Sequence, residues 1–414
     1  MAFNTLKIKY LNTNFNKLYK FADQISFSLL NIGVVLFASV FLEPAQASKY
    51  IIMNVYSSFS LVIVMAFVIT PLWVFCSEDN KKKQYNKFSL RLALVVSAIV
   101  GSIIFFIVLS KEGNLIYAFC VFYLTISYSI YDFLRRSFYI IEKDSIAACL
   151  STMLFVATTF SYTLMLLLKV TDAAIYLFTQ ALTLTTFTVA GYILNSREYG
   201  EPNNNIHYWR LCKQYLSIGK WSAASMICFW LATQGVFVIY ENHVEQQHLA
   251  LTRLALSVSG VIAIYFSSIE NKIMPVLRNQ MSLEKYSELN ITIKFYLRNS
   301  LSISIILTSL LTLASSLIMG ANNKYLLLIL VMCIYQSVSG TLKIFSFILK
   351  AKKRHKDIFY SNSLSILIVF SSTAYLYDIN IDFIKDNILS IVIFFNGIFS
   401  SLLFIYFTLL DRGK

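Results

Sequence analysis

Polar side chains recur at helical spacing inside two apolar runs near the start of the chain. Gln24, Ser28 and Asn31 stand at i, i+4 and i+7 in the first run. Asn54 and Ser57 stand at i and i+3 in the second run, so each set lies on one face of a helix. Because a polar group left unpaired in hydrocarbon is costly, we expect both faces to meet protein or a water-filled cavity. These side chains are therefore candidates for binding a polar ligand.

Basic residues inside apolar runs form a second group of candidates, since such charges are costly in a bilayer and tend to mark a transport pathway. Arg253 lies about one turn into its run, on the same helical face as Ser257. It is interpreted either as a contact for an anionic ligand or as an arginine that reaches the membrane interface. Lys343 has the same two interpretations, and the interfacial one is favoured because the residue lies near the end of its run.

Three further positions suggest coupling or gating. Asp23, near the start of the first run, is either a coupling site for H⁺ or Na⁺ or an interfacial acid stabilised by the helix dipole. Asp132 and Arg136 are spaced i, i+4, which predicts an ion pair and allows a gating role. Pro71 removes a backbone donor and predicts a kink, which is either a hinge or a packing feature.

Membrane-spanning helices are the elements that must position these residues. Of the 414 residues, 57% are hydrophobic and 14% are charged, whereas soluble domains are about 25% charged. Runs of roughly 20 apolar residues can cross a bilayer as helices. The sequence has twelve such runs: 21–42, 50–75, 88–109, 115–134, 145–168, 174–194, 219–240, 249–268, 297–318, 325–347, 358–376 and 387–410. We therefore expect an all-α integral membrane protein.

The connections between these runs alternate between short loops with few charges and basic loops. Most of the 35 Lys and Arg residues lie in the basic set or next to the termini. The positive-inside rule places that set and both termini in the cytoplasm. The net charge of +14 is therefore explained by topology and by attraction to anionic lipid, and not by nucleic-acid binding.

A long basic connection after the sixth run suggests two halves of six helices each. We expect an N-terminal lobe over 1–196, a cytoplasmic linker over 197–216 and a C-terminal lobe over 217–414. An even number of spans in each half makes the halves parallel repeats, related by an axis along the membrane normal.

Motifs for enzymatic chemistry are absent from the sequence. It contains no P-loop, no H-E-x-x-H and no G-x-S-x-G, which argues against ATP hydrolysis, a zinc protease and a serine hydrolase. The six cysteines stand singly, without C-x-x-C, so neither a disulfide framework nor a metal site is expected. We expect a protein that is not an enzyme and has no cofactor besides a coupling ion.

Four short segments occur in a characteristic order: F-A-D-Q-I-S-F-S-L-L-N at 21–31, the pair Arg135-Arg136, G-K-W-S-A-A-S at 219–225 and N-K-I-M-P at 271–275. Together they resemble the Wzx-type O-antigen flippases, in the polysaccharide-exporter branch of the MATE-like (MOP) transporter superfamily. The resemblance extends over the whole chain in length, number of helices and position of the lobe break.

The resemblance implies a multi-pass protein of the bacterial inner membrane that moves undecaprenyl-diphosphate-linked oligosaccharide to the outer leaflet by ion-coupled alternating access. In that family two six-helix lobes surround a cationic cavity lined by the first two helices of each lobe. Polysaccharide polymerase and chain-length proteins are the implied partners. In-span cations are few in this sequence, so binding would also use basic residues at the helix mouths, such as Lys49, Lys220 and Arg298. Lys49 is otherwise interpreted as an interfacial anchor.

Two other function classes remain open. A polymerase of the same pathway would need a large outward loop, and the outward loops here are short. A multidrug antiporter of the MATE branch would be expected to carry acidic residues in its cavity, where this sequence offers Asp23 at the end of a run.

Overall fold

The computed structural model describes residues 2–78, 82–141, 143–199, 208–319, 323–352, 354–378 and 382–410. Within these ranges the regular secondary structure is helical. Twelve helical segments of the described residues are long and apolar enough to cross a membrane. The predicted all-α membrane protein with twelve spans is thereby confirmed, since each predicted run overlaps with one of these segments.

Contacts between helices divide the chain into two compact units, Met1–Ala223 and Ala224–Lys414, called here the N-unit and the C-unit. The boundary lies inside one helix, α8 (Tyr208–Trp230). The predicted linker 197–216 overlaps with the end of α7 (Ala173–Tyr199) and with the start of α8. Residues 200–207, between these helices, lie outside the described residues.

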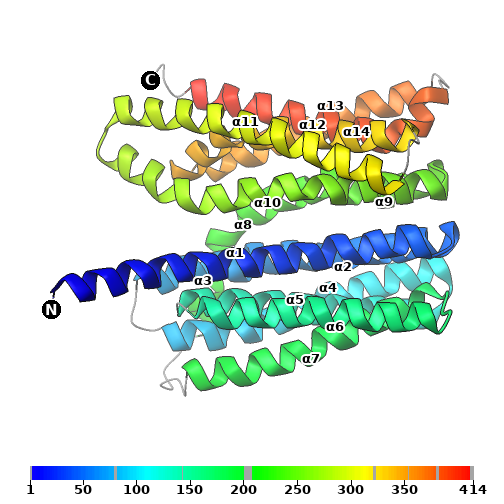
Figure 1. The fold of residues 1–414 in the computed structure, drawn as a ribbon, viewed down its shortest axis with the longest axis horizontal. Helices are drawn as coiled ribbons and strands as arrows, with labels where there is room; N and C mark the ends of the chain where they lie inside the picture. The colour runs from blue at the N-terminus through cyan, green and yellow to red at the C-terminus, as the bar shows by residue number, and fades with distance from the viewer. Residues whose placement is uncertain are drawn as a thin grey trace. The chain divides into compact units, whose positions relative to one another are not determined.

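The N-unit contains the first six spans (Figure 1). Its central helix is α5 (Leu115–Ile140), which packs against α2, α4, α6 and α7. Asn114 caps this helix, because its side chain accepts bonds from the backbone N–H groups of Ile116 (2.9 Å) and Tyr117 (3.3 Å). The other helices are α1 (Ala2–Phe41), α2 (Pro44–Val64), α3 (Thr70–Glu78), α4 (Lys82–Glu112), α6 (Asp144–Leu167) and α7 (Ala173–Tyr199). A π-helical turn, η1 (Met65–Ile69), joins α2 to α3 within one span.

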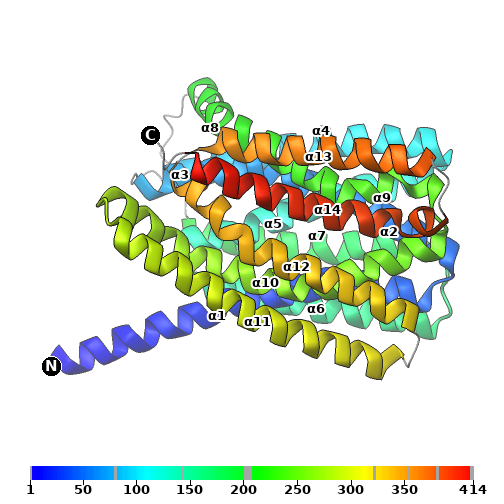
Figure 2. The same ribbon diagram turned by 90° about the horizontal axis from the view of Figure 1, so that it is seen from above.

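The C-unit contains the remaining spans. Its central helix is α12 (Asn323–Ala351), which packs against α10, α11 and α14, and these helices lie side by side in Figure 2. A second π-turn, η2 (Leu231–Gly235), joins α8 to α9 (Val236–Ile239) within a span. The other elements are η3 (Glu241–His243), α10 (Gln246–Ser282), α11 (Tyr286–Met319), α13 (His355–Asp378) and α14 (Asp382–Leu409).

Burial separates the central helices from those that face lipid. In α5, 67% of the apolar window is buried, against 17% in α11. Large apolar side chains on the outer helices are exposed, among them Phe160 (69%) and Leu317 (79%). Such exposure fits a hydrocarbon solvent, in which apolar surface costs nothing.

Several helix ends extend beyond the predicted spans, and two of them matter for the candidate site. The fourth span was predicted to end at 134, but α5 continues to Ile140. The eighth was predicted to end at 268, but α10 continues to Ser282. Hydropathy detects only the apolar part of a helix, whereas Lys, Arg and Glu are good helix formers that extend it into water. Both extensions carry charged residues of the candidate site.

Candidate functional site

A closed network of four charges connects α1 to α5 in the N-unit. Arg135 donates from Nη1 to Asp23 Oδ2 (2.7 Å) and from Nη2 to Asp132 Oδ1 (2.7 Å). Arg136 donates from Nε to Asp132 Oδ2 at 2.8 Å, which confirms the predicted Asp132–Arg136 ion pair. Two carboxylates thus face two guanidinium groups, and the formal charges cancel.

The centre of this network is dry. The side chains of Arg135 and Asp23 are 1% and 0% exposed. The guanidinium group of Arg135 lies over the ring of Phe27, 4.0 Å from the ring centroid, and Asp23 also accepts bonds from the hydroxyl groups of Ser151 and Tyr139. A buried charge is tolerated only when it is paired and hydrogen-bonded in this way. Asp23 is therefore a link between α1, α5 and α6, and its predicted role in ion coupling stays a prediction.

The polar face predicted on the second span points into the N-unit. Asn54 is buried and donates from Nδ2 to Gln180 Oε1 (3.1 Å), which also accepts from the Tyr50 hydroxyl (2.7 Å). Ser57 is fully buried and donates to the carbonyl of Met53 (3.1 Å). The structure gives both residues a packing role of the kind common between membrane helices, and their proposed contact with a ligand stays a prediction.

The polar face of α1 is less enclosed. Gln24 and Ser28 are half-buried. Asn31, also half-buried, accepts a hydrogen bond from the hydroxyl group of Tyr128 on α5. All three residues thus keep some exposed surface.

Pro71 lies two residues after the end of the π-turn η1 and is buried. The hydroxyl of Thr70 donates to the carbonyl of Met65 at 2.8 Å, across this turn. A π-turn is a local irregularity that often marks functional sites. The span is thus irregular where the sequence predicts a kink, and the hinge role remains a prediction.

The predicted cations at helix mouths have different surroundings. Lys49 pairs with Glu112 (3.2 Å) and lies over the ring of Tyr117, 5.2 Å from its centroid. Lys220 on α8 and Arg298 on α11 are exposed. The exposed pair remains accessible to an anionic group, whereas Lys49 is already engaged.

Arg253 on α10 is held inside the eighth span. It donates from Nη1 to the side-chain oxygen of Gln234 in η2, and its guanidinium group lies 5.5 Å from the ring centroid of Phe237. Ser257, one turn further, is half-buried. At Gly260 on the same face, an added Cβ would meet no heavy atom within 4 Å.

Lys343 pairs with an acid that hydropathy placed in a loop. Glu270, on the extension of α10, accepts from Lys350 (2.5 Å) and lies 3.3 Å from Lys343 Nζ. Burial favours the neutral form of Glu270, but the two ammonium groups outweigh it and lower its pKa to about 2. The carboxylate therefore stays ionised at neutral pH and holds both lysines near the C-terminal end of α12.

Sequence reasoning missed two partners in these clusters, Arg135 for Asp23 and Glu270 for Lys343. The signal for the first was present, since an acid in one span and an arginine pair at the end of another need partners. Among the described residues no group of His, Cys, Asp and Glu is arranged to hold a metal ion.

No family model and no curated protein matches the sequence. Solved structures with a similar fold are membrane transporters. A variant of the MATE transporter VcmN from Vibrio cholerae matches with a TM-score of 0.63 and 10% identity, covering 96% of each chain. An outward-facing multidrug resistance MATE transporter of the MOP superfamily matches with a TM-score of 0.60 and 10% identity, over 95% of this chain and 94% of its own.

A MOP superfamily transporter from Pyrococcus furiosus, described as having a binding pocket of reversed polarity, matches with a TM-score of 0.63 and 9% identity. The match covers 95% of this chain and 94% of that one. At these identities the likeness concerns the backbone arrangement. The chain has the fold of the MATE and MOP-superfamily transporters.

Proposed function

We propose that this protein is a transporter that flips undecaprenyl-diphosphate-linked sugar units across the bacterial inner membrane, by alternating access coupled to H⁺ or Na⁺. The diphosphate and the sugars cannot cross hydrocarbon unaided, while the polyprenyl tail can stay in lipid. Polymerase and chain-length proteins that use the flipped units are the proposed partners.

The observation that carries the proposal is the face of α10 formed by Arg253, Ser257 and Gly260. Arg253 is oriented by Gln234 and Phe237 within a span, and open space lies beside Gly260. A polar face with an arginine is not expected to meet lipid, so the space beside it is expected to hold water or a polar ligand. An arginine that is fixed in such a place suits a diphosphate.

The acids of the described spans also favour an anionic cargo. Five of the six acidic side chains in these spans pair with Lys or Arg: Asp23, Glu112, Asp132, Glu288 and Asp357. The sixth, Asp144, is buried at the start of α6. An acid that is already paired is poorly suited to attract an organic cation, which lowers the case for a multidrug exporter. That second candidate keeps the support of the fold, which it shares with the MATE antiporters.

Complementation of a bacterium that lacks its own flippase tests the proposal. The wild type, Arg253→Ala and Arg253→Lys would be expressed at equal level, with Lys294→Ala as control because Lys294 is an exposed cation on α11. We expect wild type and Lys294→Ala to restore surface polysaccharide, Arg253→Lys to restore part of it, and Arg253→Ala to lose most of it.

Three results would count against the proposal or against the role of Arg253 in it. Full activity of Arg253→Ala would remove Arg253 from the pathway. Lipid-linked units that are flipped but unpolymerised in the protein's own host after its deletion would favour the polymerase instead. Protection of cells from cationic drugs, without any effect on polysaccharide, would favour the antiporter.

A further inference from the structure

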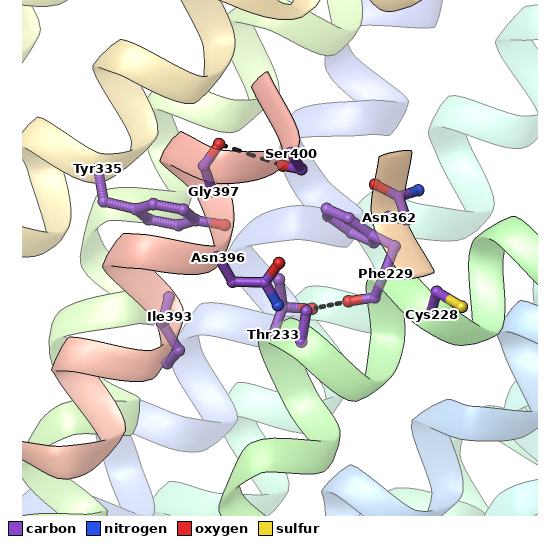
Figure 3. Close-up of a pocket in the computed structure, with 10 residues that line it drawn as sticks. Cys228, Phe229, Thr233, Tyr335, Asn362, Ile393, Asn396, Gly397 and Ser400 are labelled. Carbon is purple, nitrogen blue, oxygen red and sulfur yellow. Dashed lines mark hydrogen bonds between the residues drawn. The ribbon is translucent and has the colours of Figure 1, made fainter. Parts of the chain in front are cut away.

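A small pocket in the C-unit has no part in the function proposed above. Its walls come from α8 with the π-turn η2, and from α12, α13 and α14 (Figure 3). The pocket measures about 20 Å³, which is room for one water-sized group. Phe229 lines it and is 59% exposed, so the pocket lies at the surface of the C-unit.

The amide of Asn396 is the first group that indicates a ligand. Asn396 is 4% exposed, and its Oδ1 accepts from the hydroxyl of Ser365 at 2.5 Å. Its Nδ2 has no hydrogen-bond partner among the described residues. An unsatisfied buried polar group costs about 1–3 kcal/mol, so one end of this amide requires a partner from outside the chain.

A hydroxyl oxygen suits this amide better than a pure donor or a pure acceptor. The Ser365 hydroxyl lies within bonding distance of both Oδ1 (2.5 Å) and the backbone oxygen (2.9 Å) of Asn396. In one orientation of the amide, the Ser365 hydroxyl donates to Oδ1 and the N–H end faces the pocket. In the turned orientation, the hydroxyl accepts from Nδ2 and donates to the backbone oxygen, and the C=O end faces the pocket. A hydroxyl both donates and accepts, and satisfies the amide in both orientations.

Tyr335, on α12, provides a second polar group. Its ring packs against α14 at Gly397, where an added Cβ would lie 2.2 Å from Tyr335 Cε2. The glycine thus allows the ring to sit directly beside Asn396. Figure 3 shows the phenol oxygen of Tyr335 pointing into the space next to the Asn396 amide.

The remaining polar wall is neutral. Thr233, in the π-turn η2, donates to the carbonyl of Phe229 at 2.9 Å and keeps lone pairs that can accept (Figure 3). None of the described side chains that line the pocket carries a carboxylate or a basic group. A cation held here would lack a counter-charge, which is unfavourable at a largely buried position.

We propose that this pocket binds one neutral hydroxyl oxygen, held by the Asn396 amide and the Tyr335 phenol. The oxygen comes from water or from a sugar hydroxyl of the glycan in transport. The second source rests on the proposed function.

The first test does not depend on transport. A structure of the full chain in lipid nanodiscs without glycan, at a resolution that shows ordered water, should have an oxygen about 2.7–3.2 Å from the Asn396 amide and from Tyr335 Oη. An empty pocket would overturn the site, and so would a metal ion coordinated by Asn396 and Thr233.

The second test distinguishes water from sugar. Proteoliposomes would carry either the sugar-linked lipid or sugar-free undecaprenyl diphosphate. We expect Tyr335→Phe and Asn396→Leu to slow the sugar-linked lipid by about three- to tenfold, the equivalent of one hydrogen bond, and to leave the sugar-free lipid unchanged. Tyr296→Phe is the control, since the Tyr296 hydroxyl is buried and donates to the carbonyl of Gly340 (2.9 Å), outside the pocket.

Each outcome has one meaning. Equal losses for both lipids, or the same loss in Tyr296→Phe, would overturn the sugar as source and leave water. If the wild type moves neither lipid, the proposed function fails, while the density between Asn396 and Tyr335 still decides whether the pocket binds a hydroxyl.

Discussion

The two units neutralise charge in different ways. In the N-unit, Arg135 is 1% exposed and pairs with Asp23 and Asp132, and Arg136 pairs with Asp132. In the C-unit, one carboxylate, Glu270, holds Lys343 and Lys350, whose side chains are 36% and 35% exposed. The first cluster is balanced and dry, while the second has an excess positive charge and reaches water.

The difference indicates which cluster should be more sensitive to the loss of one member. A buried, balanced network loses much if one member is removed. A cluster whose lysines reach water loses less when its acid is removed. The following predictions test this contrast, beginning with the largest effect.

Replacing Asp23, the buried acid of the N-unit, should destabilise the protein most. We expect Asp23→Ala to lower the free energy of unfolding by about 3–5 kcal/mol, because it leaves Arg135 with one carboxylate in a dry site. Thermal unfolding of the purified protein in detergent measures this loss of stability. The double variant Asp23→Ala/Arg135→Met should recover part of the loss, since it removes both charges together. A single variant as stable as wild type would show that water reaches this network.

Replacing the acid of the C-unit should cost less. Glu270→Gln is expected to lower the free energy of unfolding by about 1–3 kcal/mol, since the lowered pKa of Glu270 sets the upper end and both lysines can turn toward water. The same unfolding experiment applies. A loss as large as that of Asp23→Ala would break the comparison, because it would mean that the lysines are trapped.

The pH dependence of stability sharpens the same point. The pKa of Glu270 is lowered from 4.5 to about 2, so its stabilising contribution is complete above pH 4.5 and is lost as the pH falls toward 2. The difference in melting temperature between wild type and Glu270→Gln should therefore be constant at higher pH and shrink below pH 4.5. A difference that shrinks already near neutral pH would contradict the assignment.

Loss of the Lys49–Glu112 pair should have the smallest effect on stability. Lys49 is 42% exposed, and pairs of this kind contribute about 0.2–1 kcal/mol. Lys49→Gln is expected to shift the melting temperature by less than Glu270→Gln does, and Lys49→Arg should restore it. A larger shift would point to the Tyr117 ring, rather than the Glu112 carboxylate, as the main partner of the ammonium group.

Local patterns in the sequence predicted local features well. Apolar length located the spans, and the i, i+4 rule found the Asp132–Arg136 pair. The mid-span amides Gln180, Gln234 and Asn396 each accept a hydrogen bond from another helix.

What the sequence could not supply was contact between distant segments. Arg135 and Asp23 are 112 residues apart, and no periodicity relates two different spans. The hydropathy pattern also missed Glu270, because it ended the eighth span at 268, two residues before this acid. The π-turns have no signal in the apolar pattern, although Pro71 follows one and Gly235 ends the other.

Each π-turn changes the side of its span on which the later side chains lie. A π-turn closes a hydrogen bond one residue later than an α-helix does, and one residue corresponds to about 100° of rotation. The segments before Met65 and after Ile69 are therefore out of phase, and so are those before Leu231 and after Gly235. A single helical wheel drawn through either span would assign its second half to the wrong side. The deletion of one residue within such a turn would restore a regular helix and keep the downstream side chains in place, whereas the same deletion elsewhere in the span would rotate them.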